Sequence, residues 1–213
     1  LLATSQNELW TWDITKIKES GPFHYYYVYV IIDVFSRYVT GFMVAKRESA
    51  ELAKELIETS CQRQHLVPEE LTLHSDRGPA MKAKSVALLL SDLGVKKSHS
   101  RPHVSNDNPF SEAQFKTLKY HPTFPERFGS VHDVRAWTQD FFNWYNHHHR
   151  HSSLGLMTPA MVHYGQAEHI REQRKQVLAA AYNAHPERFV RGISSPEPLP
   201  EAVWINPPKN EKE

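Results

Sequence analysis

A run of β-branched and aromatic residues from Phe23 to Val34 constrains the fold of this chain more than any other feature. An alternating stretch at 8–17 precedes it, and another strand-like stretch at 38–45 follows a tight turn at 35–37. Three consecutive strands with short links predict an antiparallel meander.

The spacing of apolar residues becomes helical after this meander, with apolar side chains recurring on one face of 52–57. Short strands are then expected at 71–74 and 95–98, and between them a helix that covers 86–93 and ends at Gly94. Strands first, followed by alternating helix and strand, predict an α/β fold in which a five-stranded mixed sheet is flanked by helices.

The C-terminal part is expected to be mainly helical and then extended. Ser130 and Asp133 form a capping-box pattern that predicts a long helix, and 166–184 is typical of another. Five prolines in the last 21 residues predict a loosely held tail with Trp204 as its anchor. The chain therefore divides into a core at 1–165, a helical extension at 166–192 and an extended proline-rich tail at 193–213.

Composition excludes several classes of protein. The most apolar run, Tyr25 to Val34, already contains Asp33, so no stretch is typical of a membrane span, and the N-terminal residues lack a secretory signal. The single cysteine, Cys61, excludes an internal disulfide and a zinc site built on several thiolates, and its helical setting predicts a buried thiol. A reducing compartment fits these features. Because the sequence starts at Leu1 rather than at Met, we expect a further domain upstream.

Charge is distributed unevenly along a chain whose net charge is only +1. Residues 1–76 carry seven Lys or Arg against eleven Asp or Glu, whereas residues 77–119 carry eight against three. Positive charge beside acidic candidate residues is what a site that handles a polyanion requires. A solvated helix face is the simpler explanation of the same block.

Three acidic residues stand out by their surroundings. They are Asp13 within Trp10–Thr15, Asp76 within His74–Gly78, and Glu112, which follows Asp76 after thirty-five residues and opens a helical pattern. Carboxylates gathered from distant parts of a chain can hold two divalent ions for phosphoryl transfer. Each acid also has a structural explanation, namely a paired acid in a strand, a turn residue and a charge at a helix start. Because all three explanations would have to coincide, we favour a shared site.

The helix that begins near Pro109 combines acidic and basic side chains. Glu112, Lys116 and Lys119 lie within about 60° of one another around its axis, so the carboxylate could bind metal while the lysines hold phosphates. Helix-stabilising Glu-to-Lys contacts explain the same spacing, and both interpretations can hold together. A histidine run at 147–151 favours a polar helix end or a DNA-facing basic patch over zinc, because neighbouring helical residues point in different directions.

Four segments, in order, resemble the catalytic core of DDE transposases of the bacterial insertion-sequence type, the branch nearest to retroviral integrases. The segments are Trp10–Thr15, His74–Gly78, Ser100–Lys119 with Asn106, Asp107, Asn108 and Glu112, and Trp144–Pro159 with Arg150, His151 and Leu154. The resemblance covers about residues 7–165 and, more faintly, the tail at 204–208.

This resemblance implies a ribonuclease-H-like fold with Asp13 in the first strand, Asp76 at the end of the fourth and Glu112 on a nearby helix. It implies that these three acids are catalytic and hold two Mg²⁺ ions, for which Mn²⁺ can substitute, with Asp13 shared between the ions. The implied activity is cleavage of a DNA 3′ end by water, followed by strand transfer with no covalent protein intermediate.

The remaining expectations concern partners and location. The resemblance implies contacts to double-stranded DNA, both transposon ends and target, from Arg101, His103, Lys116 and Lys119, and from Asn106 and Asn108 in a mobile loop over the site. It implies a homo-oligomer on DNA, no membrane partner, a bacterial cytoplasmic location with nucleoid association during action, and an upstream DNA-binding domain. Two alternatives stay open: a ribonuclease-H-like nuclease that does not join DNA, and a catalytically silent DNA-binding relic.

Overall fold

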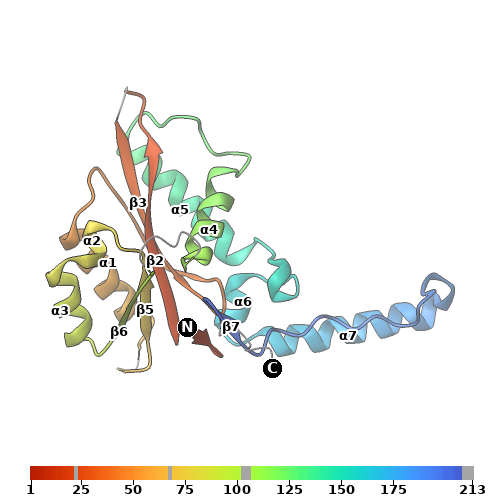
Figure 1. Ribbon diagram of the computed structural model, residues 1–213. Coiled ribbons are helices and arrows are strands. Elements are labelled where there is room, and N and C mark those ends of the chain that lie inside the picture. The colour runs from red at the N-terminus through yellow and green to blue at the C-terminus, as the bar shows by residue number, and fades with distance from the viewer. Residues whose placement is uncertain (22–23, 67–68, 102–106, 208–213) are drawn as a thin grey trace.

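The computed structural model describes residues 1–21, 24–66, 69–101 and 107–207. Its centre is a five-stranded sheet with the strand order β4-β3-β2-β5-β6 (Figure 1). The strands are β2 (Leu9–Lys18), β3 (Tyr25–Asp33), β4 (Val39–Ala45), β5 (Thr72–Ser75) and β6 (Lys96–His99). β3 is antiparallel to both β2 and β4, whereas β5 is parallel to both β2 and β6. The expected mixed sheet and its antiparallel meander are confirmed.

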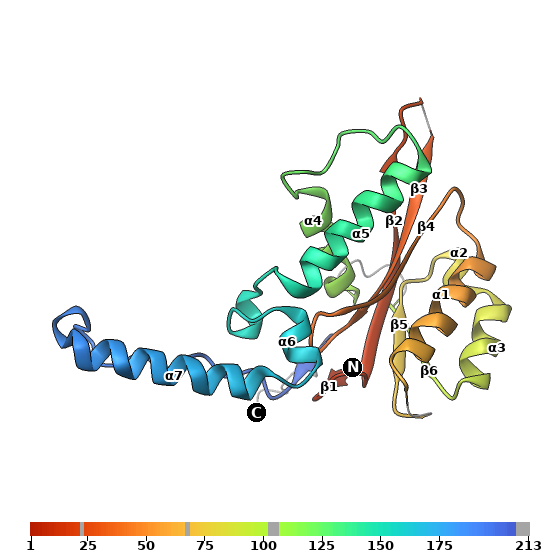
Figure 2. The same cartoon turned by 180° about the vertical axis from the view of Figure 1, so that it is seen from behind.

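Helices cover both faces of the sheet, and alternation along β2 determines what each face contacts. Trp10 and Trp12 pack with α1 (Ala50–Arg63), α2 (Pro79–Lys82) and α3 (Lys84–Asp92) on one side. Side chains at odd positions of β2 point to the opposite side, where α4 (Pro109–Lys119) and α5 (Val131–His147) lie (Figures 1 and 2). The central strand therefore separates two apolar cores.

Local signals explain most helix boundaries. The Ser130 side chain accepts a hydrogen bond from the Asp133 N–H at 3.1 Å, which confirms the expected cap of α5. Gly94, at φ 66°, follows α3 in the left-handed conformation that glycine adopts easily. Cys61 is buried as expected, and burial raises the pKa of its thiol to about 11. The short helices α2 and α6 (Pro159–His163) were not expected, although each has proline in its first turn.

An arm extends away from the sheet. It consists of α7 (Ala167–Ala184) and the chain that runs back beside it (Figures 1 and 2). Ala167 is the buried residue of α7, so most of this helix contacts solvent. Short 3₁₀ turns lie at Ser152–Leu154 and Pro186–Arg188. None of the helices in the described ranges combines the length and apolar character needed to cross a bilayer.

The two ends of the chain form a second, two-stranded sheet, which the sequence did not predict. β1 (Leu2–Ala3) pairs antiparallel with β7 (Val203–Trp204). The expectation that Trp204 anchors the tail is wrong, because its side chain is 40% exposed while Val203 and Ile205 on either side of it are buried. Alternation along a strand places neighbouring side chains on opposite faces, so the smaller residues enter the core.

Candidate active site

Asp13 and Asp76 occupy equivalent positions on neighbouring strands. The parallel pairing of β2 with β5 ends at Trp12 opposite Ser75; Asp13 is the next residue of β2, and Asp76 directly follows the end of β5. Neighbouring strands lie about 4.8 Å apart, so the backbone brings the two carboxylates to one level of the sheet. Ligands of open α/β sheets bind at this carboxyl end of the parallel strands.

Hydrogen bonds connect the first turn of α4 to β2, on the face of the sheet that carries Asp13. The Thr11 hydroxyl donates to the Asn108 side-chain oxygen and lies 3.2 Å from the Ser111 hydroxyl. Glu112 follows Ser111, and its N–H donates to the Asn108 carbonyl at 3.2 Å. These contacts bring Glu112 towards Asp13 while its own side chain stays exposed.

Asp13 lies close to other acidic side chains, and this proximity affects its pKa. Burial, together with the charges of Asp76, Glu112 and Glu48, raises the pKa of Asp13 to about 7 against an opposing hydrogen bond from the Ile14 N–H at 2.7 Å. Without a cation, Asp13 therefore holds a proton close to neutral pH. A carboxylate surrounded by like charge and apolar atoms suits a bound cation.

Asp76 combines the turn role that its sequence context suggested with its place beside Asp13. Its Oδ1 accepts a hydrogen bond from the Gly78 N–H at 2.8 Å, which orients the carboxylate at the start of α2. His99 Nδ1 donates to the Asp76 carbonyl at 3.0 Å. The turn is therefore held from β6, and the turn role does not conflict with a place beside Asp13.

Chemically the donors suit a hard cation, because carboxylate oxygens are the ligands that Mg²⁺ prefers. Within the described ranges, no three Asp, Glu, His or Cys side chains already converge as metal ligands. The structure thus brings Asp13 and Asp76 together and leaves Glu112 nearby with its side chain turned to solvent. The histidines at 147–151 form no such cluster either. Burial lowers the pKa of His149, and lowers that of His151 to about 4, so these two rings are neutral at pH 7.

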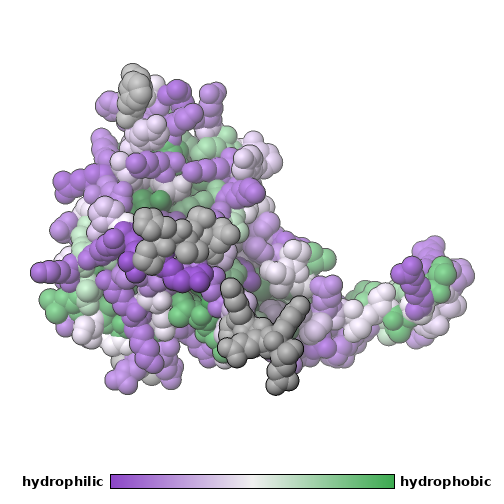
Figure 3. Space-filling view, viewed as in Figure 1, coloured by the Kyte–Doolittle hydropathy of each residue, from purple (hydrophilic) through white to green (hydrophobic). Residues whose placement is uncertain are grey.

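Basic side chains border the acids along α4. Lys116 and Lys119 line an open groove of about 600 Å³ together with Glu112 and Thr15. The pKa of Lys119 is lowered by partial burial, and the charge of Asp13 acts against this shift. In the space-filling view, hydrophilic side chains cover most of the upper part of the face where β2 and β3 extend (Figure 3). Lys116 and Lys119 therefore place positive charge in this groove beside Glu112.

Two residues expected to contact DNA have hydrogen-bond partners within the protein. Arg101 donates through Nε and Nη2 to the two carboxylate oxygens of Asp107, at 3.0 and 2.8 Å. Asn108 is 4% exposed and is bonded to Thr11, so it is a buried link between α4 and β2 rather than part of a loop over the site. A polar residue beside a loop looks the same in sequence whether it faces inward or outward. His103 and Asn106 lie outside the described residues.

Sequence reasoning gave no role to Asp107 or His74, yet both support the site. Asp107 is 1% exposed, and His74 Nε2 donates to its carbonyl at 2.9 Å. The only available signal was their presence in the segments that carry Asp76 and Glu112.

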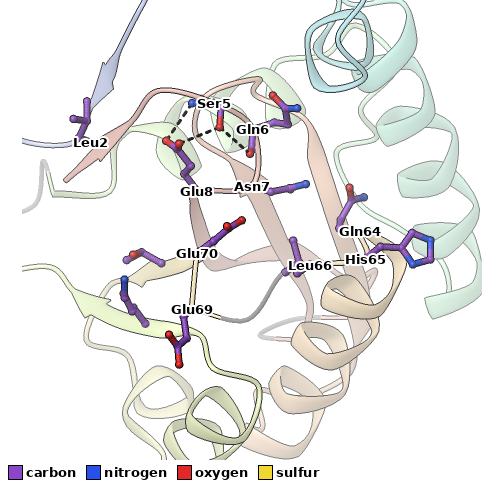
Figure 4. A pocket seen from close by; sticks show the side chains of 12 residues that line it. Leu2, Ser5, Gln6, Asn7, Glu8, Gln64, His65, Leu66, Glu69 and Glu70 are labelled. Carbon is purple, nitrogen blue, oxygen red and sulfur yellow. Dashed lines mark hydrogen bonds between the residues drawn. The ribbon is translucent and has the colours of Figure 1, made fainter.

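A second hollow, of about 700 Å³, lies at the opposite end of the parallel strands. Glu8, Glu69 and Glu70 line it (Figure 4). The Glu8 carboxylate already accepts hydrogen bonds from the N–H groups of Thr4 and Ser5, at 2.6 and 3.1 Å. The amino ends of the strands are far from the paired aspartates, so this hollow is separate from the candidate site.

The sheet order and the acids at its carboxyl end define a ribonuclease-H-like core, and comparisons with known proteins agree. Residues 3–105 and 93–159 match two families that are both described as integrase core domain. Between them the two matches span residues 3–159, so this part of the chain is similar to integrase core domains.

Similar proteins include transposases of bacterial insertion sequences. The transposase of IS904 from Lactococcus lactis is 31% identical over 164 residues, which cover 74% of this chain and 61% of the relative. The putative transposase InsK of IS150 from Escherichia coli is 26% identical over 158 residues, which cover 74% of this chain and 54% of that protein. The chain therefore spans little more than half the length of these relatives.

Solved structures share the fold at lower identity. The integrase catalytic core of HTLV-2 in complex with magnesium matches with a TM-score of 0.56 and 17% identity, over 75% of this chain and 97% of that one. A chain of the simian T-cell lymphotropic virus intasome matches with a TM-score of 0.60 and 19% identity, over 76% of this chain and 56% of that one. The catalytic domain of Mos1 mariner transposase matches with a TM-score of 0.53 and 17% identity, over 64% and 70%.

Proposed function

We propose that this chain is the catalytic core of an insertion-sequence transposase that cleaves the 3′ ends of the element and joins them to target DNA. The observation that supports the proposal is that strand pairing brings Asp13 and Asp76 to one level of the sheet, where burial and like charge together raise the pKa of Asp13. The insertion-sequence transposases among its relatives support the same conclusion.

In this proposal Asp13, Asp76 and Glu112 hold two Mg²⁺ ions, for which Mn²⁺ can substitute. Bound ions of this kind lower the pKa of an attacking oxygen and stabilise charge on the oxygen that leaves. Asp13 must give up its proton to take part, so the site is acid-sensitive. Glu112, exposed on the first turn of α4, reaches the pair by rotating its side chain.

The remaining groups of the chain bind and orient the DNA. Lys116 and Lys119 hold backbone phosphates in the groove beside Glu112, which keeps the scissile bond next to the acids. The first step uses water and releases a 3′-hydroxyl, and the second uses that hydroxyl to attack the target strand.

Joining two ends of an element requires at least two active sites, so we propose a homo-oligomer assembled on double-stranded DNA. The viral intasome among the structural neighbours is consistent with such an arrangement. The location proposed is the bacterial cytoplasm, with nucleoid association during the reaction.

The test is a pair of assays on labelled DNA that carries the ends of the element, with Mg²⁺ or Mn²⁺. Asp76→Asn should abolish metal-dependent nicking and leave DNA binding intact, because it removes a ligand charge without changing the shape of the turn. Ends that are already cleaved should be joined by the wild-type protein.

The same assays separate the alternatives. Nicking without joined product would identify a nuclease, and DNA binding without nicking would identify a silent relic. Nicking that survives Asp76→Asn would contradict the assigned site.

A further inference from the structure

The C-terminal tail reaches the base of the catalytic helix. After β7, Ile205 is buried at 1% exposure beside Ala3, Leu9 and Val34. The next residue, Asn206, donates from Nδ2 to Asp107 Oδ1 at 2.7 Å. A residue near the end of the described chain thus bonds directly to the residue just before Asn108 and α4.

Asp107 is held by residues from three separate segments of the chain. Its carboxylate accepts from the Arg101 N–H at 2.7 Å as well as from the Arg101 guanidinium, and from Asn206. Its carbonyl accepts from His74 on β5. Hydrogen bonds from Arg101 hold the pKa of Asp107 well below its usual range, so this nearly buried carboxylate stays ionised. An ionised, buried group needs its partners, and Asn206 is the one that the tail supplies.

A short path of contacts connects Asp107 to the acids. Asn108 follows directly and is bonded to Thr11, two residues from Asp13 on the same face of β2. The Asn108 carbonyl accepts the N–H of Glu112. The position of Asp107 therefore fixes where the first turn of α4 begins, and with it the position of Glu112 relative to Asp13.

The tail does not need the hydrogen bond from Asn206 to pack against the rest of the protein. Val203 and Ile205 supply the apolar contacts of the tail, and β7 supplies its backbone pairing. The backbone at Asn206 is left-handed, with φ 54°, which asparagine tolerates better than most residues. That preference accounts for the residue type but not for an amide directed at a buried carboxylate.

We propose that Asn206 is a positioning residue for the active site: by holding Asp107, it sets the first turn of α4 so that Glu112 can join Asp13 and Asp76. This inference rests on the proposed function. It also makes the tail part of the catalytic unit, although the tail lies outside the five-stranded sheet.

Two substitutions in the full chain separate the amide from the backbone conformation. Asn206→Gly keeps the left-handed backbone and removes the amide, whereas Asn206→Asp keeps the shape and directs a second carboxylate at Asp107. Partners that orient metal ligands affect metal affinity or activity by about 10- to 100-fold when removed. We expect both variants to nick DNA at least about tenfold more slowly and to need more Mn²⁺ for half-maximal rate, with Asn206→Asp more affected. Asn183→Asp, which adds the same charge at an exposed position of α7, should behave as wild type.

Amide hydrogen exchange supplies a readout that needs no activity. We expect faster exchange within α4 in both Asn206 variants, with β3 and β4 unchanged. Wild-type nicking rates and Mn²⁺ dependence in both variants would overturn the inference. Faster exchange throughout the sheet would also overturn it, because Asn206 would then support the fold as a whole. A wild-type protein that does not nick DNA would refute the proposed function, and the exchange pattern of α4 would still decide whether Asn206 positions this helix.

Discussion

Replacing Asp13 by Asn should stabilise the metal-free protein at alkaline pH while it abolishes the proposed activity. Burial and neighbouring acids raise the pKa of Asp13 from 3.8 to about 7. The folded protein therefore retains a proton that the unfolded chain has lost between these two values. Because the folded state binds more protons in this window, its stability falls as the pH rises from about 4 to about 7, and the full penalty applies at pH 8.

The size of the effect follows from the same numbers. A pKa about three units above its usual value corresponds to about 4 kcal/mol of free energy of unfolding, at 1.36 kcal/mol per unit. Asp13 is partly rather than fully buried, so solvent screening reduces the expected gain for Asp13→Asn to about 2 kcal/mol. For a chain of this length that gain raises the melting temperature by about 4–8 °C.

The assay is thermal and urea unfolding in a chelating buffer at pH 8 and at pH 4. The advantage of Asp13→Asn should be large at pH 8 and small at pH 4, where the carboxyl is protonated in the folded protein and still about half protonated in the unfolded chain. Asp140→Asn, at an exposed position of α5, controls for the loss of a surface charge. Added Mn²⁺ should stabilise the wild-type protein at pH 8 and not Asp13→Asn, because a ligand that binds only the folded state shifts unfolding. Equal stabilities at pH 8, or a gain that is independent of pH, would refute the reasoning.

Two further predictions concern DNA binding and the attachment of α4. The double variant Lys116→Glu, Lys119→Glu should weaken DNA binding at low salt. The slope of the logarithm of the binding constant against the logarithm of the salt concentration should become shallower by about 0.9 for each phosphate that the protein no longer neutralises. Titrations at several salt concentrations measure this slope, and Lys54→Glu on α1 should change it little. Thr11→Val should lower the free energy of unfolding in urea by about 1–3 kcal/mol, because it leaves the buried Asn108 side chain without its hydroxyl partner, and an unchanged value would contradict the role given to that bond.

Some parts of the fold could be predicted because the pattern is local. Alternation and β-branched composition at 8–17 and 38–45 were enough to place strands, and Ser130 marks the start of α5 because a cap depends on residues only a few positions away. The acids could be proposed as one site from their local contexts, and β2–β5 pairing supplies the reason that Asp13 and Asp76 meet.

Other features depend on contacts between distant parts of the chain. Trp204 was expected to anchor the tail because of its size, but strand alternation buries Ile205 instead. Whether a side chain is buried depends on which distant segment packs against it in the folded protein. The spacing of residues in the sequence does not show which segment that is.

The α/β class and the order of the strands along the chain follow from the amino-acid sequence, because they depend on periodicity, and short motifs were enough to propose the three acids. Only the folded chain shows that β1 pairs with β7, that Asn108 faces inward and that Asn206 reaches Asp107. The physical reason is that a buried polar group must find a hydrogen-bond partner, and here those partners come from segments nearly one hundred positions away in the chain.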